Sequence, residues 1–215
     1  MSISPGRGYI FVHIPKTGGT SMAAALEARA QRDDILIGDT PKALRRKKRL
    51  AGLAACGRLW KHSTLADIDG ILTPEDIASM FCFTLVRNPW DRAVSYYHWL
   101  RDQSFEHPAV RLAKKHEFEA FVLHPHTAAS FGAYPSASYM RDATGVERAT
   151  CYIRLEHMEE DMIPLVAHLC FVPEVEHINL SARAKDYRRF YSETSAAHIA
   201  SLCDPDISRF GYRFG

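Results

Sequence analysis

The chain has 215 residues, of which 47% are hydrophobic and 24% are charged, and its formal net charge is +2. This length suits one α/β domain over residues 1–215, and the composition is that of a soluble globular protein rather than a low-complexity chain. No stretch approaches about 18 uninterrupted apolar residues, and the first residues lack a basic segment followed by a long apolar one. We therefore expect neither a membrane span nor a secretory signal, and a cytoplasmic location.

The five cysteines are an odd number and show no CxxC spacing, so they indicate neither a disulfide framework nor a zinc site. We expect buried free thiols. The cysteines are Cys56, Cys82, Cys151, Cys170 and Cys203.

The first predicted element is the short apolar run "YIFVHI" at residues 9–14, whose β-branched and aromatic residues are typical of a buried parallel strand. It contains His13, which we expect to be a core residue. Thr20 and Ser21 then open "SMAAALEARA", whose composition favours a helix. The segment therefore predicts a strand, a tight loop and a helix.

The loop "PKTGGTS" carries groups that bind anions. Gly18 and Gly19 let the backbone approach a ligand closely, Thr20 and Ser21 supply hydroxyl donors, and Lys16 adds a cation at the positive end of a helix. A nucleotide phosphate fits this chemistry. The nucleoside triphosphate loop G-x-x-x-x-G-K-[ST] has a different order, because here the lysine precedes the glycines. A purely structural turn is the alternative.

A basic run follows at Lys42–Arg49, "KALRRKKR", with six of the 27 basic residues and no acid. Without it the balance is 21 basic against 25 acidic residues, or −4. The run indicates a local site for an anionic partner rather than a surface that coats nucleic acid. The alternative is a solvated helix face.

A second strand-to-helix unit is predicted after a short helix that begins at Thr73 and Pro74. Its strand covers residues 80–86, Asn88 is the N-cap, and Pro89 occupies the first helical position. In open parallel sheets, ligands bind beyond the carboxyl ends of the strands. Both turns are therefore expected to face one crevice.

Arg87 and Ser95 are the candidate ligands of the second turn, since a guanidinium and a hydroxyl suit a second phosphate. In the alternative interpretation Asn88 only caps the helix and Arg87 forms an ion pair. Asp91 fits that interpretation better, as an acidic residue in the first helical turn.

The rest of the chain predicts helices and loops over residues 103–150, a third strand at 151–155, and a helix interrupted near Pro164. No internal repeat or linker divides the chain.

"HIPKTGGTS", followed by "FTLVRNPWDRAVSYY", resembles the sulfotransferases that use 3'-phosphoadenosine 5'-phosphosulfate (PAPS), specifically the carbohydrate branch acting on heparan, dermatan and chondroitin. "SYMRDATG", "IRLEHMEEDM", "HINLSAR" and "RFGY" resemble later pieces of the same pattern. The resemblance implies a P-loop-like three-layer fold with a central parallel sheet flanked by helices. It also implies transfer of a sulfuryl group to an acceptor hydroxyl, leaving adenosine 3',5'-bisphosphate, without a metal ion.

The resemblance also implies residue roles. Residues 16–21, including Thr17, match the family's 5'-phosphosulfate loop, and Arg87 and Ser95 match its 3'-phosphate motif. Lys16 would act on the leaving oxygen. The late segment "NLSAR" resembles a loop that closes over the cofactor, with Arg183 as its main candidate and Asn179 and Ser181 beside it.

His62, in "KHSTL", is the candidate general base, because related carbohydrate sulfotransferases carry a histidine in a similar segment and imidazole titrates near neutrality. A surface or capping role is the alternative. The acceptor class, a saccharide or glycolipid, is implied by the family alone. The basic run Lys42–Arg49 would steer an anionic acceptor or lipid surface to the site.

Two other functions stay open at this point. A metal-dependent kinase or NTPase needs carboxylates to hold Mg²⁺, and neither phosphate turn offers an obvious one. A nucleotide-sensing or nucleic-acid-binding module would use the basic run, but aromatic residues do not interleave it, so we expect no nucleic-acid partner.

Overall fold

The structure, a computed structural model, describes residues 1–176 and 186–215. Its described residues form two compact units, which are treated separately here. The first comprises Met1–Val86 and Ser136–Ile178, and the second comprises Arg87–Pro135 and Asn179–Gly215. The single domain expected over residues 1–215 stays a prediction, because a compact unit is not the same thing as a separately folding domain.

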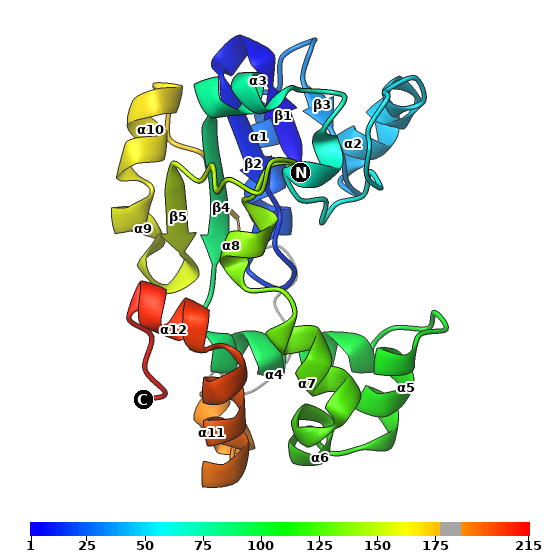
Figure 1. Cartoon of the computed structure of the whole chain (residues 1–215), viewed down its shortest axis with the longest axis vertical. Coiled ribbons are helices and arrows are strands. Elements are labelled where there is room, and N and C mark those ends of the chain that lie inside the picture. The colour runs from blue at the N-terminus through cyan, green and yellow to red at the C-terminus, as the bar shows by residue number, and fades with distance from the viewer. Residues whose placement is uncertain (177–185) are drawn as a thin grey trace. The chain divides into compact units, whose positions relative to one another are not determined.

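A five-stranded sheet is the centre of the first unit (Figure 1). Its strands in chain order are β1 (Ser2–Ser4), β2 (Tyr9–Val12), β3 (Ile35–Leu36), β4 (Phe81–Val86) and β5 (Cys151–Arg154). The order across the sheet is β3-β1-β2-β4-β5. Strands β2, β4 and β5 are parallel, whereas β1 is antiparallel to both of its neighbours. The carboxyl ends of β2 and β4 therefore share one edge of the sheet.

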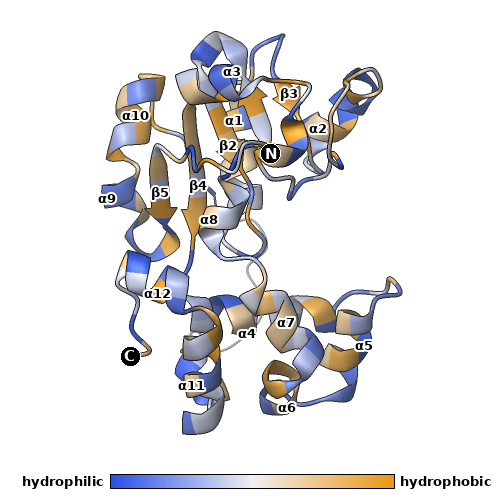
Figure 2. Cartoon of the chain, in the orientation of Figure 1, coloured by the Kyte–Doolittle hydropathy of each residue, from blue (hydrophilic) through white to orange (hydrophobic). Residues whose placement is uncertain are grey.

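The central strands alternate their side chains between two covered faces. Figure 2 shows many apolar residues, in orange, on the strands of the sheet. Phe11 lies opposite Phe83 in the register, and their ring centroids are 5.1 Å apart. This face packs on Met22 of α1 and Leu165 of α10. On the other face, Cys82 reaches α3 through its thiol. The α/β sheet with helices on both faces is the expected architecture.

The helices of the first unit begin where the sequence supplies caps. In α3, Thr73 and Asp76 form a reciprocal capping box, and proline occupies the first turn. The α-helices are α1 (Gly19–Ala28), α2 (Pro41–Arg46), α3 (Pro74–Ser79), α8 (Ser136–Tyr139), α9 (Met158–Asp161) and α10 (Ile163–Leu169). The 3-10 helices are η1 (Pro5–Arg7), η2 (Lys47–Leu50), η3 (Ala66–Ile68) and η4 (Leu155–His157).

The second unit is helical in its described residues and has its own core around α4. Trp90, Val94 and Tyr97 of α4 pack against Phe121 of α6 and Ile199 of α11. The α-helices are α4 (Pro89–Arg101), α5 (Pro108–Lys115), α6 (Phe118–Leu123), α7 (Pro125–Gly132), α11 (Glu193–Leu202) and α12 (Asp204–Phe210), and one 3-10 helix is η5 (Tyr187–Phe190).

The predicted strands at 80–86 and 151–155 and the helices begun by Thr73 and Asn88 are confirmed. The helix break near Pro164 is also present, between α9 and α10. The parallel centre of the sheet, formed by β2, β4 and β5, is confirmed, and β1 adds antiparallel pairs at one side. Two expectations were wrong in detail. The strand from Tyr9 ends at Val12, and two thiols, Cys56 and Cys170, are exposed.

The free thiols of Cys82 and Cys203 are buried as expected. Over residues 1–176 and 186–215, no helix is long and apolar enough to cross a membrane. Within the same ranges, no group of three or more metal-ligating side chains comes together.

Candidate active site

The loop between β2 and α1 turns sharply through two left-handed residues. Lys16 has φ 66° and Gly18 has φ 85°, on either side of Thr17. Positive φ is costly for a residue with a Cβ, so the surrounding contacts must hold Lys16 in this conformation. Turns that alternate left-handed residues in this way gather backbone N–H groups around an anion.

Thr17 closes the loop from inside. Its hydroxyl donates to the carbonyl oxygen of Ile14 at 2.9 Å, and the residue is 1% exposed. The side chain of Thr17 therefore shapes the loop, and its part in binding the donor stays a prediction.

The amino end of α1 is available to an anion. Its N-cap is Gly18, which supplies no side-chain cap, and the first N–H groups bonded back to it are those of Ser21 and Met22, at 3.1 and 3.3 Å. Helix geometry leaves the preceding N–H groups, of Gly19 and Thr20, without a carbonyl of their own helix. Together with the helix dipole, these groups suit a phosphate or sulfate.

His13 explains why Gly19 has no side chain. A Cβ on Gly19 would lie 2.0 Å from Cδ2 of the His13 ring and 2.5 Å from its Nε2. His13 follows β2 directly and is 6% exposed, so the expectation of a buried residue is confirmed. The ring of His13 is thus the wall against which the start of α1 packs.

His62 is brought to the same place from a segment 49 residues further along the chain. Its Nδ1 lies 2.8 Å from the main-chain oxygen of His13, and the two rings are 4.6 Å apart at 68°. A carbonyl oxygen can only accept, so Nδ1 carries the hydrogen and Nε2 keeps its lone pair. This is the tautomer that a general base acting through Nε2 requires.

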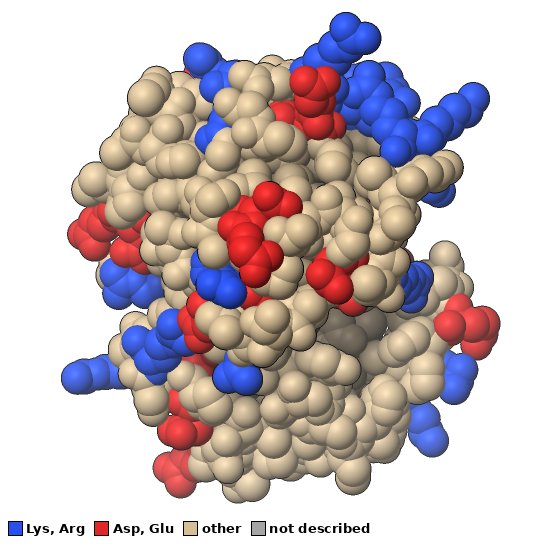
Figure 3. Space-filling model, turned by 45° about the horizontal axis from the view of Figure 1, so that its top comes forward, with Lys and Arg blue, Asp and Glu red and all other residues tan. Residues whose placement is uncertain are grey.

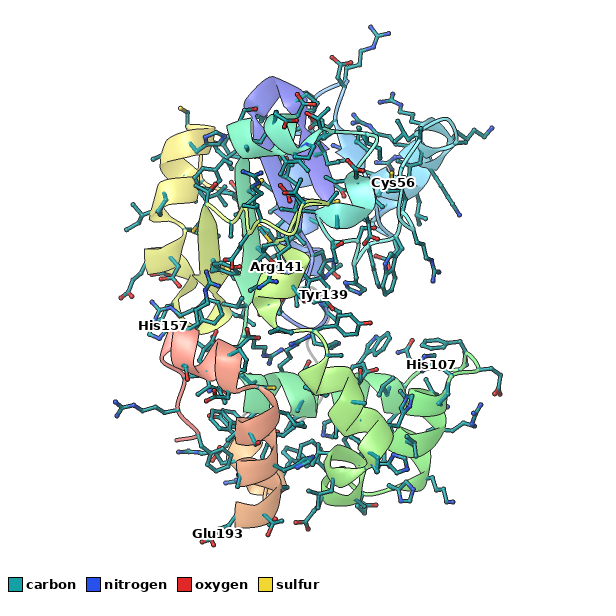
Figure 4. All side chains as sticks on the ribbon, in the orientation of Figure 1. Cys56, His107, Tyr139, Arg141, His157 and Glu193 are labelled. Carbon is teal, nitrogen blue, oxygen red and sulfur yellow. The ribbon has the colours of Figure 1, made fainter. Side chains whose placement is uncertain are left out.

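The segment around His62 is held by several hydrogen bonds. The hydroxyl of Ser63, a fully buried residue, donates to the carbonyl oxygens of Arg58 and Trp60. Leu65 donates its N–H to the carbonyl oxygen of Tyr139, the residue at the end of α8 that Figure 4 labels. Because this frame is fixed, the His62 ring is positioned by the fold.

Burial keeps both imidazoles neutral. It lowers the pKa of His62 to about 4, and the hydrogen bond to His13 opposes this only in part. Burial also holds the pKa of His13 well below its usual value of 6.5, and the charge that His62 would carry lowers it further. At neutral pH the His62 ring is therefore neutral, and its pKa lies below the near-neutral value that the sequence argument for a general base assumed.

Arg87 and Ser95 lie in the second unit, Arg87 just before α4 and Ser95 near the middle of that helix. The Nε and Nη2 atoms of Arg87 donate to one carboxylate oxygen of Asp91 at 2.9 and 2.6 Å. Asn88 accepts from the N–H groups of Trp90 and Asp91, so both features of the capping alternative are present. Asp91 and Ser95 are four residues apart and share one side of α4.

Asn88 has a further role that the sequence did not reveal. Its amide nitrogen donates to the Tyr187 hydroxyl at 3.3 Å and to the Arg213 carbonyl oxygen at 3.1 Å. These residues are 99 and 125 positions away, so no local pattern could have linked them. Asn88 therefore joins the start of α4 to later segments of its own unit.

The predicted site residues thus fall into three groups. Residues 16–21 and His62 come together in the first unit, and Arg87 and Ser95 lie on α4 in the second. Asn179, Ser181 and Arg183 lie outside the described residues.

Comparisons with known proteins agree with the predicted class. The model of the sulfotransferase family matches residues 1–212. A crystal structure of the mouse sulfotransferase SULT7A1 complexed with PAP is similar at a TM-score of 0.43 and 17% identity, covering 95% of this chain and 67% of that one. The curated proteins yield no match. On its match to the family model, the chain belongs to the sulfotransferase family, which confirms the predicted enzyme class and its donor, PAPS.

Proposed function

We propose that this sulfotransferase acts on a hydroxyl of a saccharide or glycolipid, with His62 as the general base and Lys16 on the leaving phosphate. The observation that carries the role of His62 is its 2.8 Å hydrogen bond to the His13 carbonyl oxygen, which leaves Nε2 as the acceptor. The family match decides against the kinase and the non-catalytic alternatives.

The residues of the loop fit the donor. The start of α1 presents N–H groups without a side-chain cap, and Lys16 precedes them in the turn. These groups would hold the 5'-phosphosulfate, and Arg87 and Ser95 would hold the 3'-phosphate, as the sequence motifs predict. When bound, PAPS supplies the sulfuryl group, and the rest of the molecule leaves as adenosine 3',5'-bisphosphate.

The chain's own residues then have three tasks. Lys16 and the helix end neutralise charge on the leaving phosphate oxygen, which lowers the barrier because the charges are fixed before reaction. His62 takes the proton of the acceptor hydroxyl at Nε2. The His13 carbonyl keeps Nδ1–H bonded, so that the ring holds its orientation while it is protonated.

The basic run Lys42–Arg49 would attract an anionic acceptor. Because salt screens this attraction, we expect added salt to weaken acceptor binding. Neutralising these residues should reduce that salt dependence.

The test is transfer of labelled sulfate from PAPS to a panel of saccharides and glycolipids, with wild type and His62→Asn compared. We expect the variant to lose about 100- to 10,000-fold in turnover while it binds the product adenosine 3',5'-bisphosphate as wild type does. His168→Asn is a matched control, because His168 also bonds a backbone carbonyl, that of Arg7 at 2.8 Å. Equal turnover in His62→Asn and wild type would remove His62 from the mechanism, and transfer to none of these acceptors would contradict the acceptor class.

A further inference from the structure

A cavity lies in the first unit, beside the edge strand β3. Its volume is about 420 Å³, within the range of small-molecule sites, and three arginines line it: Arg32, Arg46 and Arg49. Figure 3 shows the basic side chains of this part of the chain gathered at the upper right of the view. None of the residues assigned above to donor binding or catalysis lines it.

The cavity is separate from the phosphate loop by topology. Leu36 is paired with Ser2 and Ser2 with Phe11, so β3 runs parallel to β2 with β1 between them. Residues 32–34 precede β3 and lie towards the amino edge of the sheet, whereas the phosphate loop leaves β2 at the carboxyl edge. Two strand spacings, about 10 Å, also separate β3 from β2.

Two of these arginines, Arg46 and Arg49, each use one guanidinium nitrogen to bond backbone carbonyl oxygens beside the cavity. Nη1 of Arg46 donates to the carbonyl oxygen of Gln31 at 2.8 Å and to that of Asp34 at 3.4 Å. Nη1 of Arg49 donates to the carbonyl oxygen of Arg32 at 2.7 Å. Among the described residues, neither guanidinium pairs with a carboxylate, and their Nε and Nη2 atoms make no hydrogen bond. Oriented guanidinium donors of this kind suit a sulfate, phosphate or carboxylate.

Asp34 lines the same cavity and contributes a hydrogen-bond acceptor, whereas the arginines contribute donors. It is 3% exposed, and its Oδ2 accepts the N–H of Gln31 at 2.8 Å. Its Oδ1 is buried and has no hydrogen-bond partner in the described part of the chain. A buried carboxylate oxygen left in this state is costly, so it calls for a donor such as a hydroxyl. Inorganic sulfate offers no such donor.

A second acidic residue, Asp33, and three apolar side chains complete the lining. Ile35, Leu36 and Leu50 supply a surface that suits the C–H face of a pyranose ring. The helix α2, which carries Arg46, is anchored to α1, because its N-cap Thr40 donates to the Glu27 carboxylate of α1 at 2.5 Å.

We propose that this cavity is a second saccharide site, which binds a pyranose unit carrying both hydroxyls and an anionic group. The arginines bind the sulfate or carboxylate, and Asp34 accepts from a hydroxyl. The choice of a saccharide rests on the proposed acceptor class, whereas the arginines and the Asp34 oxygen left unpartnered among the described residues support an anion that carries hydroxyl groups.

The test is calorimetric titration of the full chain at low ionic strength with N-acetylglucosamine 6-sulfate, beside neutral N-acetylglucosamine and inorganic sulfate. We expect only the sugar sulfate to bind well. Arg46→Ala should weaken binding of the sugar sulfate about tenfold or more. Asp34→Asn replaces an acceptor oxygen with an N–H donor at the place where the sugar hydroxyl must donate. It should weaken binding of the sugar sulfate but not binding of inorganic sulfate.

Arg45→Ala is the matched control, because it removes the same charge from the same run without lining the cavity. If Arg45→Ala and Arg46→Ala weaken binding equally, the run acts only as diffuse charge and the proposal is wrong. Binding to phosphatidylserine vesicles without binding of the sugar sulfate would overturn it in favour of a lipid surface. Each variant is also titrated with adenosine 3',5'-bisphosphate and assayed for sulfate transfer, so failure of the cavity is distinguished from failure of the proposed function.

Discussion

Gly19→Ala tests whether the His13 ring fixes the start of α1. The new Cβ would lie 2.0, 2.5 and 2.7 Å from three atoms of that ring. The closest approach is about 1.5 Å shorter than an ordinary contact near 3.5 Å. The ring has little room to move, because His13 is 6% exposed and packs against His62 and Phe11.

Overpacking of this kind costs about 1–3 kcal/mol, and alanine returns up to about 1 kcal/mol as a better helix former. We therefore expect the free energy of unfolding, measured by urea denaturation, to fall by about 1–2 kcal/mol. Affinity for adenosine 3',5'-bisphosphate should fall as well, because the displaced helix end is part of the anion site.

Gly52→Ala is the control, since a Cβ there meets nothing within 4 Å. On a His13→Ala background the space is vacant, so Gly19→Ala should cost little or nothing. The reasoning is refuted if Gly19→Ala costs no more than Gly52→Ala, or if its cost is the same with and without the His13 ring.

Three further predictions concern the loop, the imidazoles and α4. Thr17→Val removes the buried hydrogen bond to Ile14, so the free energy of unfolding should fall by about 1–3 kcal/mol in urea denaturation, with Thr17→Ser as control. His62 has a lowered pKa in the folded state, so between about pH 6.5 and 4 the unfolded state binds more protons and stability falls with falling pH, by up to about 3 kcal/mol. Thermal unfolding across this range should show a smaller loss in His62→Asn, and an equal loss would contradict the assignment. Asn88→Ala removes the N-cap of α4 and should cost about 0.5–2 kcal/mol, whereas Asn88→Asp should restore the loss only in part, because aspartate keeps the cap but cannot donate to the Arg213 carbonyl oxygen; no loss in the alanine variant would contradict a stabilising cap.

The strand-to-helix units could be predicted from sequence because their signals are local. The run before Arg87 is apolar and β-branched, and Asn88 with Pro89 marks a helix start. Strands β1 and β3 have three and two residues, too few for a period-2 pattern to appear. The sequence therefore could not predict that these two strands join the sheet with antiparallel pairing.

The site was predictable in its residue types but not in its construction. The glycines and Lys16 indicate an anion loop, but the left-handed conformation of a lysine depends on tertiary contacts. The hydrogen bond between His62 and His13 joins residues 49 positions apart, which spacing alone cannot indicate. The cytoplasmic location and the role of the late "NLSAR" segment stay predictions.

The central claim is that two motifs together bind a nucleotide with phosphates at both the 3' and 5' positions. Calorimetric titration with adenosine 3',5'-bisphosphate and with ADP tests it most directly, on wild type, Lys16→Ala and Arg87→Ala. We predict that wild type prefers the bisphosphate by at least about tenfold, that Arg87→Ala loses this preference, and that Lys16→Ala weakens both ligands alike. A wild type that binds ADP as tightly as the bisphosphate, or a preference that survives Arg87→Ala, would contradict the account.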